Sequence, residues 1–224
     1  MYFRIKLSFP RPPADLVQAV GAYPTGNICD AMNRSGAMNE KIRPMWPGLK
    51  IAGPALTVNM RPCDNAVMYK AMEIAQPGDI LVFAHGKGTM YSATWGELAS
   101  NIACAKGIGG LVSEGLVRDL EGLREVGFPV FAVGTTPNSP YKDGPGQVNF
   151  PIVCGDVLVN PGDIIVGDDD GVVVVPQQNA QRVLENLKVI AAKEQSLLAG
   201  IRAGQLIPDW VEPLLREKGC EFIE

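Results

Sequence analysis

The stretch Trp95-Gly96-Glu97-Leu98-Ala99-Ser100, read with Gly115-Leu116-Val117-Arg118-Asp119, decides how the chain is organised. Twenty residues separate Glu97 from Arg118, which is room for one helix and one strand. Two loops at the same edge of a sheet would then bring a carboxylate, a guanidinium and a second carboxylate together. This spacing predicts a site for a divalent cation and a small anion.

The first half of this stretch predicts the start of a helix at Gly96, running from Glu97 to Ala105. The first amides of a helix have no acceptor within the helix, so those of Leu98 and Ala99 would point into the same space. Such a helix end attracts carboxylates. We therefore expect Gly96, Leu98 and Ala99 to bind the anion.

The second half offers Arg118 as a forked cationic donor and Asp119 as a metal ligand. Asp is a very common helix cap, and from spacing alone a cap before a helix ending near Val126 is the more frequent role. The pairing with Arg118 and with the upstream Glu97 favours the metal ligand instead. A structural ion pair is the competing interpretation of Arg118.

Outward from this site, segments 65–133 alternate between helix and strand, whereas residues 148–175 contain short β-rich runs. Ile80–Ala84 is apolar enough for a strand buried on both faces. Residues 33–54, rich in Gly, Pro and Asn, are expected to form a long loop. The pattern favours an α/β fold, a layered β/β/α sandwich, over a doubly wound sheet.

The C-terminal part is predicted to contain the longest helix, from Gln178 to about Leu198, with apolar residues at helical spacing. Glu194 falls on this apolar stripe and needs a partner there. A pairing with Lys193 or a neighbouring Arg, or exposure near the helix end, is the simple explanation. We expect one domain over residues 1–204 and a helical tail over 205–224.

Composition excludes several classes of protein. The 20 Lys and Arg against 24 Asp and Glu give a net charge of −4 without a basic run, so no nucleic-acid partner is expected. No apolar run of eighteen residues occurs, so no membrane partner is expected either. Five scattered cysteines argue against a disulfide framework and predict a cytoplasmic location.

The lone histidine, His85, follows a predicted strand and could reach the same cleft. Its ordinary role is a loop or pocket-wall residue, and a phosphohistidine carrier is the alternative. Gly86-Lys87-Gly88 matches only part of a phosphate-binding loop. Neither Lys70 nor Lys87 has surroundings that predict an amine nucleophile.

The acidic residue, twenty-residue gap and Arg-Asp pair resemble a family that contains 4-hydroxy-4-methyl-2-oxoglutarate aldolases, oxaloacetate decarboxylases and the ribonuclease-regulator proteins called RraA. The resemblance runs from about Pro24 to about Ala199. It includes Asp30-Ala31-Met32, Gln76-Pro77-Gly78-Asp79 and Gly162-Asp163-Ile164-Ile165-Val166-Gly167-Asp168. The family's swivelling β/β/α fold agrees with the layered sandwich expected from the pattern.

The resemblance implies a class II aldolase that releases pyruvate from a 4-hydroxy-2-oxo acid. By this likeness Arg118 orients the 2-oxo acid, Asp119 ligates Mg²⁺ or Mn²⁺, and Glu97 holds or polarises a water. Glu194 matches a glutamate that relatives supply from a neighbouring subunit to the metal's outer shell, which implies a homotrimer or hexamer. Glu97 is one methylene longer than the Asp of related aldolases, whereas RraA-type regulators are described as having Gly there.

Overall fold

The computed structural model describes residues 3–86, 88 and 90–223. The helices are α1 (Ala14–Gly21), α2 (Thr25–Ala31), α3 (Met68–Ile74), α4 (Glu97–Ala105), α5 (Leu120–Val126), α6 (Ala180–Arg202) and α7 (Val211–Glu217), with the short 3₁₀ helix η1 (Gln177–Asn179). The strands are β1 (Arg4–Ile5), β2 (Arg43–Pro44), β3 (Ile51–Met60), β4 (Ile80–Ala84), β5 (Ala93–Trp95), β6 (Gly110–Val117), β7 (Val130–Thr135), β8 (Gly146–Val148), β9 (Ile152–Cys154), β10 (Val157–Val159), β11 (Ile164–Asp168) and β12 (Gly171–Val175).

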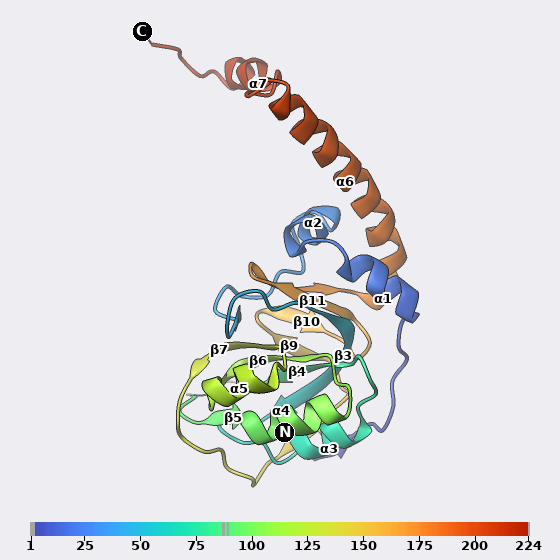
Figure 1. Ribbon diagram of the computed structural model, residues 1–224, viewed down its shortest axis with the longest axis vertical. Helices are drawn as coiled ribbons and strands as arrows, with labels where there is room; N and C mark the ends of the chain where they lie inside the picture. Colours follow the sequence, from blue (N-terminus) through green and yellow to red (C-terminus); the bar gives the residue numbers. More distant parts are fainter. Residues whose placement is uncertain (1–2, 87, 89, 224) are drawn as a thin grey trace. The chain divides into compact units, whose positions relative to one another are not determined.

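The main sheet has the strand order β1-β8-β3-β4-β6-β7-β2 (Figure 1). Its centre, β3-β4-β6-β7, is parallel, and helices α3, α4 and α5 connect these strands. The long strand β3 also pairs antiparallel with β11, which continues into β12. A parallel centre requires crossover connections, and the helical segments expected between residues 65 and 133 supply them.

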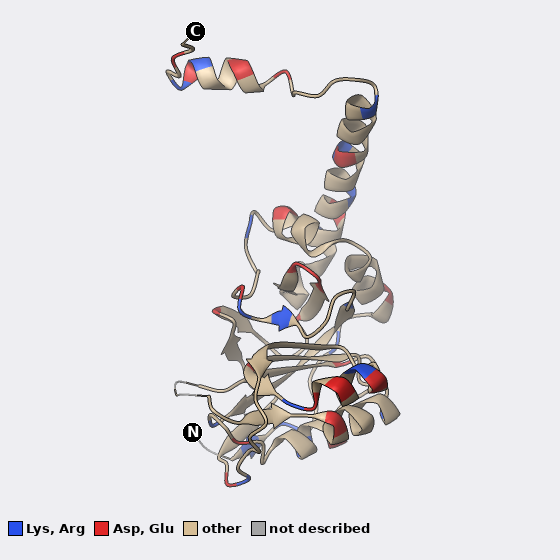
Figure 2. Ribbon diagram, turned by 60° about the vertical axis from the view of Figure 1, so that its left-hand side comes forward, with Lys and Arg blue, Asp and Glu red and all other residues tan. Residues whose placement is uncertain are grey.

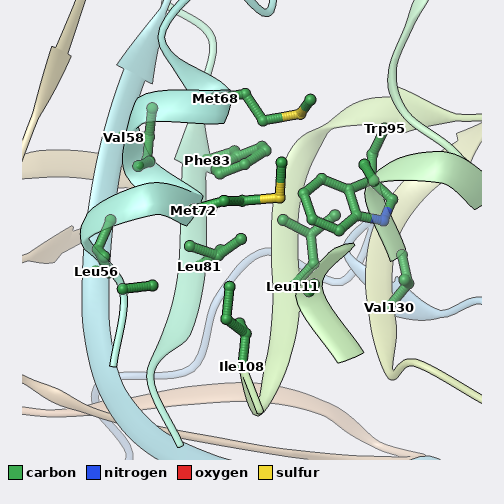
Figure 3. Packing of buried hydrophobic residues seen from close by; sticks show 14 of the residues in the cluster. Leu56, Val58, Met68, Met72, Leu81, Phe83, Trp95, Ile108, Leu111 and Val130 are labelled. Atoms are coloured by element: carbon green, nitrogen blue, oxygen red, sulfur yellow. The ribbon is translucent and has the colours of Figure 1, made fainter. Parts of the chain in front are cut away.

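Side chains of β4 alternate between two apolar cores, which defines the layers. Leu81 and Phe83 belong to the core beneath the helices, together with Met68 and Met72 of α3 (Figure 3). Ile80, Val82 and Ala84 belong to the opposite core, which contains residues of β9 to β12. Successive strand residues point to opposite faces, so the sequence of a strand that is buried on both faces is one continuous apolar run. The β/β/α sandwich expected from the sequence is confirmed.

Several elements coincide with their predicted bounds and others do not. The strand at 80–84 and the helix at 97–105 are confirmed at those residues. The loop expected over 33–54 was wrong in part, because β2 forms at Arg43–Pro44 and β3 begins at Ile51. Pro54 sits within β3, where Ala55 N–H donates to the Asp163 carbonyl.

The chain divides into two compact units, Met1–Leu187 and Lys188–Glu224. The division falls within α6, whereas the sequence led us to expect a tail from residue 205. The second unit contains the rest of α6 and the helix α7, and many of its large apolar side chains are exposed. Over the described ranges, no helix is long and apolar enough to cross a membrane.

Charged residues are mixed in sign along the described chain. Figure 2 shows short Lys and Arg segments and short Asp and Glu segments interspersed along the chain. No extended basic stretch is visible among the parts that Figure 2 colours. The expectation that no nucleic acid binds stays a prediction.

Candidate functional site

The segments 95–100 and 115–119 meet where β5 and β6 end. These strands pair in parallel, and α4 begins after β5 while α5 begins after β6. The N–H of Arg118 donates to the Trp95 carbonyl at 3.0 Å, which fixes one loop against the other. Carboxyl ends of parallel strands lie at one edge of a sheet, and the predicted convergence of Gly96, Arg118 and Asp119 follows from that geometry.

Asp119 stands at the N-cap position of α5 but does not cap that helix with its side chain. Its backbone is left-handed, with φ 58° and ψ 45°, a conformation that costs a non-glycine residue of the order of 1 kcal/mol. The carboxylate turns to α4 instead, where Oδ2 accepts from the Glu97 N–H at 3.3 Å. The capping interpretation is therefore wrong, and the carboxylate is directed at the start of the neighbouring helix.

Arg118 lies beside Asp119 and extends across the site. Its Nε is 3.3 Å from Asp119 Oδ2, and its Nη1 donates to Ser139 Oγ at 2.6 Å. The side chain is about one third exposed, so the guanidinium is accessible from solvent. An ion pair this accessible adds little to stability, and its fixed orientation suits the recognition of an anion.

Gly96 permits this close approach. A Cβ at position 96 would lie 2.6 Å from Asp119 Oδ2 and 3.1 Å from Arg118 Cγ. Real side chains do not tolerate the first distance, so any larger residue would displace the carboxylate. The glycine is thus required by the packing of Asp119 and Arg118 against the start of α4.

A cavity of about 230 Å³ opens in front of these groups. Gly96, Leu98, Ala99, Arg118 and Asp119 all line it, as the sequence led us to expect. The amides of Leu98 and Ala99 belong to the first turn of α4 and have no intrahelical acceptor. The cavity therefore combines a guanidinium, a carboxylate and a helix N-terminus.

The sequence did not predict several of the polar residues that line the cavity, among them Asn65, Ser139 and Lys142. Asn65 is 5% exposed, and its Oδ1 has no hydrogen-bond partner within the described residues. Ser139 and Lys142 come from the loop between β7 and β8. The sequence carries no periodic signal for a loop residue, and only the fold brings that loop to α4.

The side chain of Glu97 points away from the cavity lining. A Cβ on Gly122 of α5 would lie 2.5 Å from Glu97 Oε2, so the carboxylate rests on the first turn of α5. Glu97 is exposed, and its backbone N–H is the part that contacts Asp119. The role of its carboxylate in holding a water stays a prediction.

Glu194 belongs to α6 in the second unit and is exposed. Its role at the metal of a neighbouring subunit also stays a prediction. No group of three or more His, Cys, Asp or Glu side chains with metal-binding geometry occurs in the parts of the chain that were described. Within the first unit, Asp119 is the carboxylate that lines the cavity.

His85 lies behind the cavity wall and is 2% exposed. Its Nε2 is 3.4 Å from Oγ1 of Thr94, which lines the cavity, and 3.3 Å from Ser113 Oγ. Burial lowers the pKa of His85 from 6.5 to about 4, so the ring is neutral at physiological pH. A phosphohistidine carrier needs an exposed ring, and that alternative is wrong. Lys87 lies outside the described residues.

Residues 25–174 match the family model described as RraA-like, Aldolase/RraA. A protein of Halalkalibacterium halodurans provisionally named 4-hydroxy-4-methyl-2-oxoglutarate aldolase is 36% identical over 182 residues, which are 81% of this chain and 86% of that protein. The crystal structure of Streptomyces coelicolor RraAS2, titled an unusual member of the RNase ES inhibitor RraA protein family, has a TM-score of 0.76 at 28% identity and covers 86% of this chain and 98% of that one.

An uncharacterized protein of Pseudomonas syringae pv. tomato has a TM-score of 0.77 at 26% identity, with 88% of this chain and 96% of that chain covered. The family match covers the two loops and both helices that form the cavity. The chain therefore belongs to the RraA-like family of aldolases and RraA proteins.

Proposed function

We propose that this protein is a lyase that cleaves a 4-hydroxy-2-oxo acid to pyruvate and a second carbonyl compound in a reaction dependent on a divalent metal ion. Candidate substrates are 4-hydroxy-4-methyl-2-oxoglutarate and 4-carboxy-4-hydroxy-2-oxoadipate. Oxaloacetate would be decarboxylated through the same enolate. The observation that carries the proposal is the convergence of Arg118, Asp119 and the N-terminus of α4 in one cavity.

The cavity groups suit an anionic 2-oxo acid. The free amides of Leu98 and Ala99 are placed to bind the C1 carboxylate, because the start of a helix favours negative charge. Arg118 would contact the C2 oxygen with its forked donors. Lys142 at the cavity wall offers a cation for a second carboxylate farther along the substrate.

The retro-aldol step breaks the C3–C4 bond. The C4 hydroxyl gives its proton to the Glu97 carboxylate through the water that Glu97 is proposed to hold, and the C4–O group becomes a carbonyl. The electron pair of the broken bond moves into the C2 carbonyl to form an enolate. Arg118 stabilises the charge that develops on the C2 oxygen. A proton delivered to C3 completes pyruvate, and a water held by Glu97 is the proposed source. Loss of CO₂ from oxaloacetate generates the same enolate.

Asp119 is the proposed protein ligand of Mg²⁺ or Mn²⁺. Its carboxylate lines the cavity and is not engaged in capping α5, and Mg²⁺ is commonly held by one or two carboxylates with water. The residues present therefore fit a hard cation. Such an ion, when bound, withdraws charge from the enolate as a Lewis acid.

We further propose that the protein is a homotrimer or a hexamer with its active site at a subunit interface, where Glu194 reaches a neighbour's metal. The second unit exposes large apolar side chains, including Val189 at 71%, Ile207 at 70% and Trp210 at 62%. A surface of that kind is typical of a protein interface. No disulfide joins the cysteines of the described chain, which supports the proposed cytoplasmic location.

The proposal is tested by measuring pyruvate release from a panel of 4-hydroxy-2-oxo acids and from oxaloacetate. We expect activity that EDTA abolishes and that Mg²⁺ or Mn²⁺ restores. Asp119→Asn should lose at least about a hundredfold in kcat/KM while its thermal unfolding is unchanged, because its exposed charge contributes little to stability. Full activity after chelation would contradict the proposal.

The alternative is a non-catalytic RraA-type binding protein that regulates a ribonuclease. The likeness to Streptomyces coelicolor RraAS2 favours it. The acidic residue Glu97 in place of the Gly described for such regulators counts against it. Inhibition of a ribonuclease by a protein that releases no pyruvate from any substrate of the panel would establish this alternative.

A further inference from the structure

Asp64 is a buried carboxylate that joins two separate segments at the cavity wall. It is 1% exposed, and its two oxygens accept three backbone N–H groups. Oδ1 accepts from Ala66 at 2.8 Å within its own segment. Oδ2 accepts from Asp143 at 2.8 Å and from Gly144 at 2.9 Å, about eighty residues later in the chain.

Backbone hydrogen bonds connect the same two segments. Tyr141 N–H donates to the Cys63 carbonyl at 2.8 Å, and Asn65 N–H donates to the Tyr141 carbonyl at 3.0 Å. Arg61 Nη2 lies 3.7 Å from a carboxylate oxygen of both Asp64 and Asp143. The turn around Asp64 is therefore hydrogen-bonded to the loop between β7 and β8 at Tyr141, Asp143 and Gly144.

The loop between β7 and β8 carries two of the polar groups that line the cavity. Ser139 accepts a hydrogen bond from Arg118, and Lys142 lies between Tyr141 and Asp143, whose backbones are both held. Asn65, which follows Asp64 directly, lines the cavity from the other segment. The Asp64 carboxylate, together with the backbone hydrogen bonds at Tyr141, thus joins two segments that both place polar groups at the cavity wall.

We propose that Asp64 is a positioning residue that holds the 139–144 loop and thereby fixes Lys142 for recognition of the substrate's second carboxylate. The inference rests on the proposed function for its consequence in substrate selection, whereas the loop contact itself does not. A buried carboxylate is retained only where its hydrogen bonds offset its desolvation, and the amides of Asp143 and Gly144 supply two of them.

The test compares Asp64→Asn with a matched control, Asp163→Asn. Asn keeps the shape but has a single acceptor oxygen, so at least one of the held amides loses its partner. Asp163 is also buried, at 3%, and accepts from the N–H groups of Asn160 and Gln177, but it does not line the cavity. Both variants lose hydrogen bonds from backbone amides. Only the turn at Asp64 holds the 139–144 loop.

The first readout is the rate of tryptic cleavage after Lys142, which is exposed. We expect cleavage at this bond to be about tenfold faster in Asp64→Asn and unchanged in Asp163→Asn, since one lost buried hydrogen bond corresponds to roughly a factor of ten. Equal rates in both variants and the wild type would overturn the proposal. This readout stands even if the wild-type protein releases no pyruvate, in which case the proposed function alone fails.

The second readout is the steady-state kinetics of pyruvate release. Asp64→Asn should raise KM about tenfold for a substrate with a second carboxylate, with a smaller effect on a 4-hydroxy-2-oxo acid that lacks one. A general loss of folding would affect both substrates equally, and an equal change would contradict a role through Lys142.

A wild-type measurement covers the case in which Asp64→Asn does not fold. The amides of Asp143 and Gly144 should show hydrogen-exchange protection although they lie outside helices and strands. Exchange at the rate of an open loop would overturn the proposal.

Discussion

At the scale of single residues, the role proposed for Arg118 depends on the shape of its side chain as well as on its charge. It contacts Asp119 through Nε and Ser139 through Nη1, so two separate donors fix its orientation. A lysine would keep the charge but could not make both contacts in one plane. These two contacts therefore require a guanidinium.

Replacing Arg118 with Lys should lower kcat/KM for pyruvate release by about a hundredfold and change the free energy of unfolding by less than about 1 kcal/mol. The matched control is Arg124→Lys, since Arg124 is exposed in the last turn of α5 and does not line the cavity. Steady-state kinetics and urea unfolding measure the two effects. Equal activity of both variants would show that charge alone suffices at position 118.

Substitution of Gly96 provides a second test, because it changes the space available to the Asp119 carboxylate. An alanine methyl group would lie 2.6 Å from Asp119 Oδ2, so the carboxylate must move. We expect Gly96→Ala to reduce kcat/KM by roughly ten- to a hundredfold, because a small displacement of a catalytic group is costly. Gly26→Ala is the control, since a Cβ there meets nothing within 4 Å. Unchanged kinetics for Gly96→Ala would mean that Asp119 need not stay where it is.

At the scale of elements, His85 fills the space between β4, β5 and β6. Gly115 of β6 permits this packing, because a Cβ there would lie 2.5 Å from His85 Nε2. The register of β6 against β7 shifts between Ser113 and Leu116, beside the ring. The neutral imidazole thus packs beneath β6, the strand that ends at Val117, directly before Arg118.

This burial gives the fold a pH dependence. Burial lowers the pKa of His85 from 6.5 to about 4, so below pH 6.5 the unfolded chain binds a proton that the folded protein does not. Stability therefore falls as pH drops from 6.5 towards 4, by roughly 3 kcal/mol over the whole interval. Glu114, which accepts from the His85 N–H at 3.4 Å, has a pKa raised by burial and acts in the opposite direction.

The contribution of His85 is isolated by comparing urea unfolding of the wild type and His85→Gln at pH 7 and pH 5. The wild type should lose about 2 kcal/mol more than the variant over this interval. His85 is the single histidine of the chain, so its imidazole resonance can be followed directly by NMR. A ring that titrates near 6.5 in the folded protein would contradict the predicted burial effect.

For the whole molecule, the proposed assembly makes a prediction about mixed subunits. If Glu194 acts on a neighbour's site, neither Glu194→Gln nor Asp119→Asn is active alone, but a mixed oligomer contains some intact sites. Unfolding and refolding the two variants together should therefore restore up to about a third of the wild-type activity in a trimer. Light scattering should give three or six times the 24.0 kDa chain mass.

Asp119→Asn mixed with Arg118→Ala provides the control, because both residues line the same cavity and no intact site can form. Recovery in the first mixture alone would support a shared site. No recovery in either mixture, with both variants oligomeric, would show that Glu194 does not act across an interface.

The sequence by itself determined the layered fold and the backbone of the site. The apolar run Ile80–Ala84 specified a strand buried on both faces, and Gly96 with the following residues specified the start of α4. The interval from Glu97 to Arg118 fixed one helix and one strand, and consecutive parallel strands end at the same sheet edge. These features follow from local patterns and short connections, which a sequence displays directly.

Only the tertiary structure decided which distant loop reaches the cavity and which of the predicted side chains turn away from it. Lys142 reaches the wall because Asp64, nearly eighty residues earlier, holds its loop. The carboxylate of Glu97 lies against Gly122, and His85 is buried beneath β6, although both follow predicted elements closely. Loop positions and side-chain directions depend on contacts between segments distant in the chain, and periodicity carries no information about such contacts.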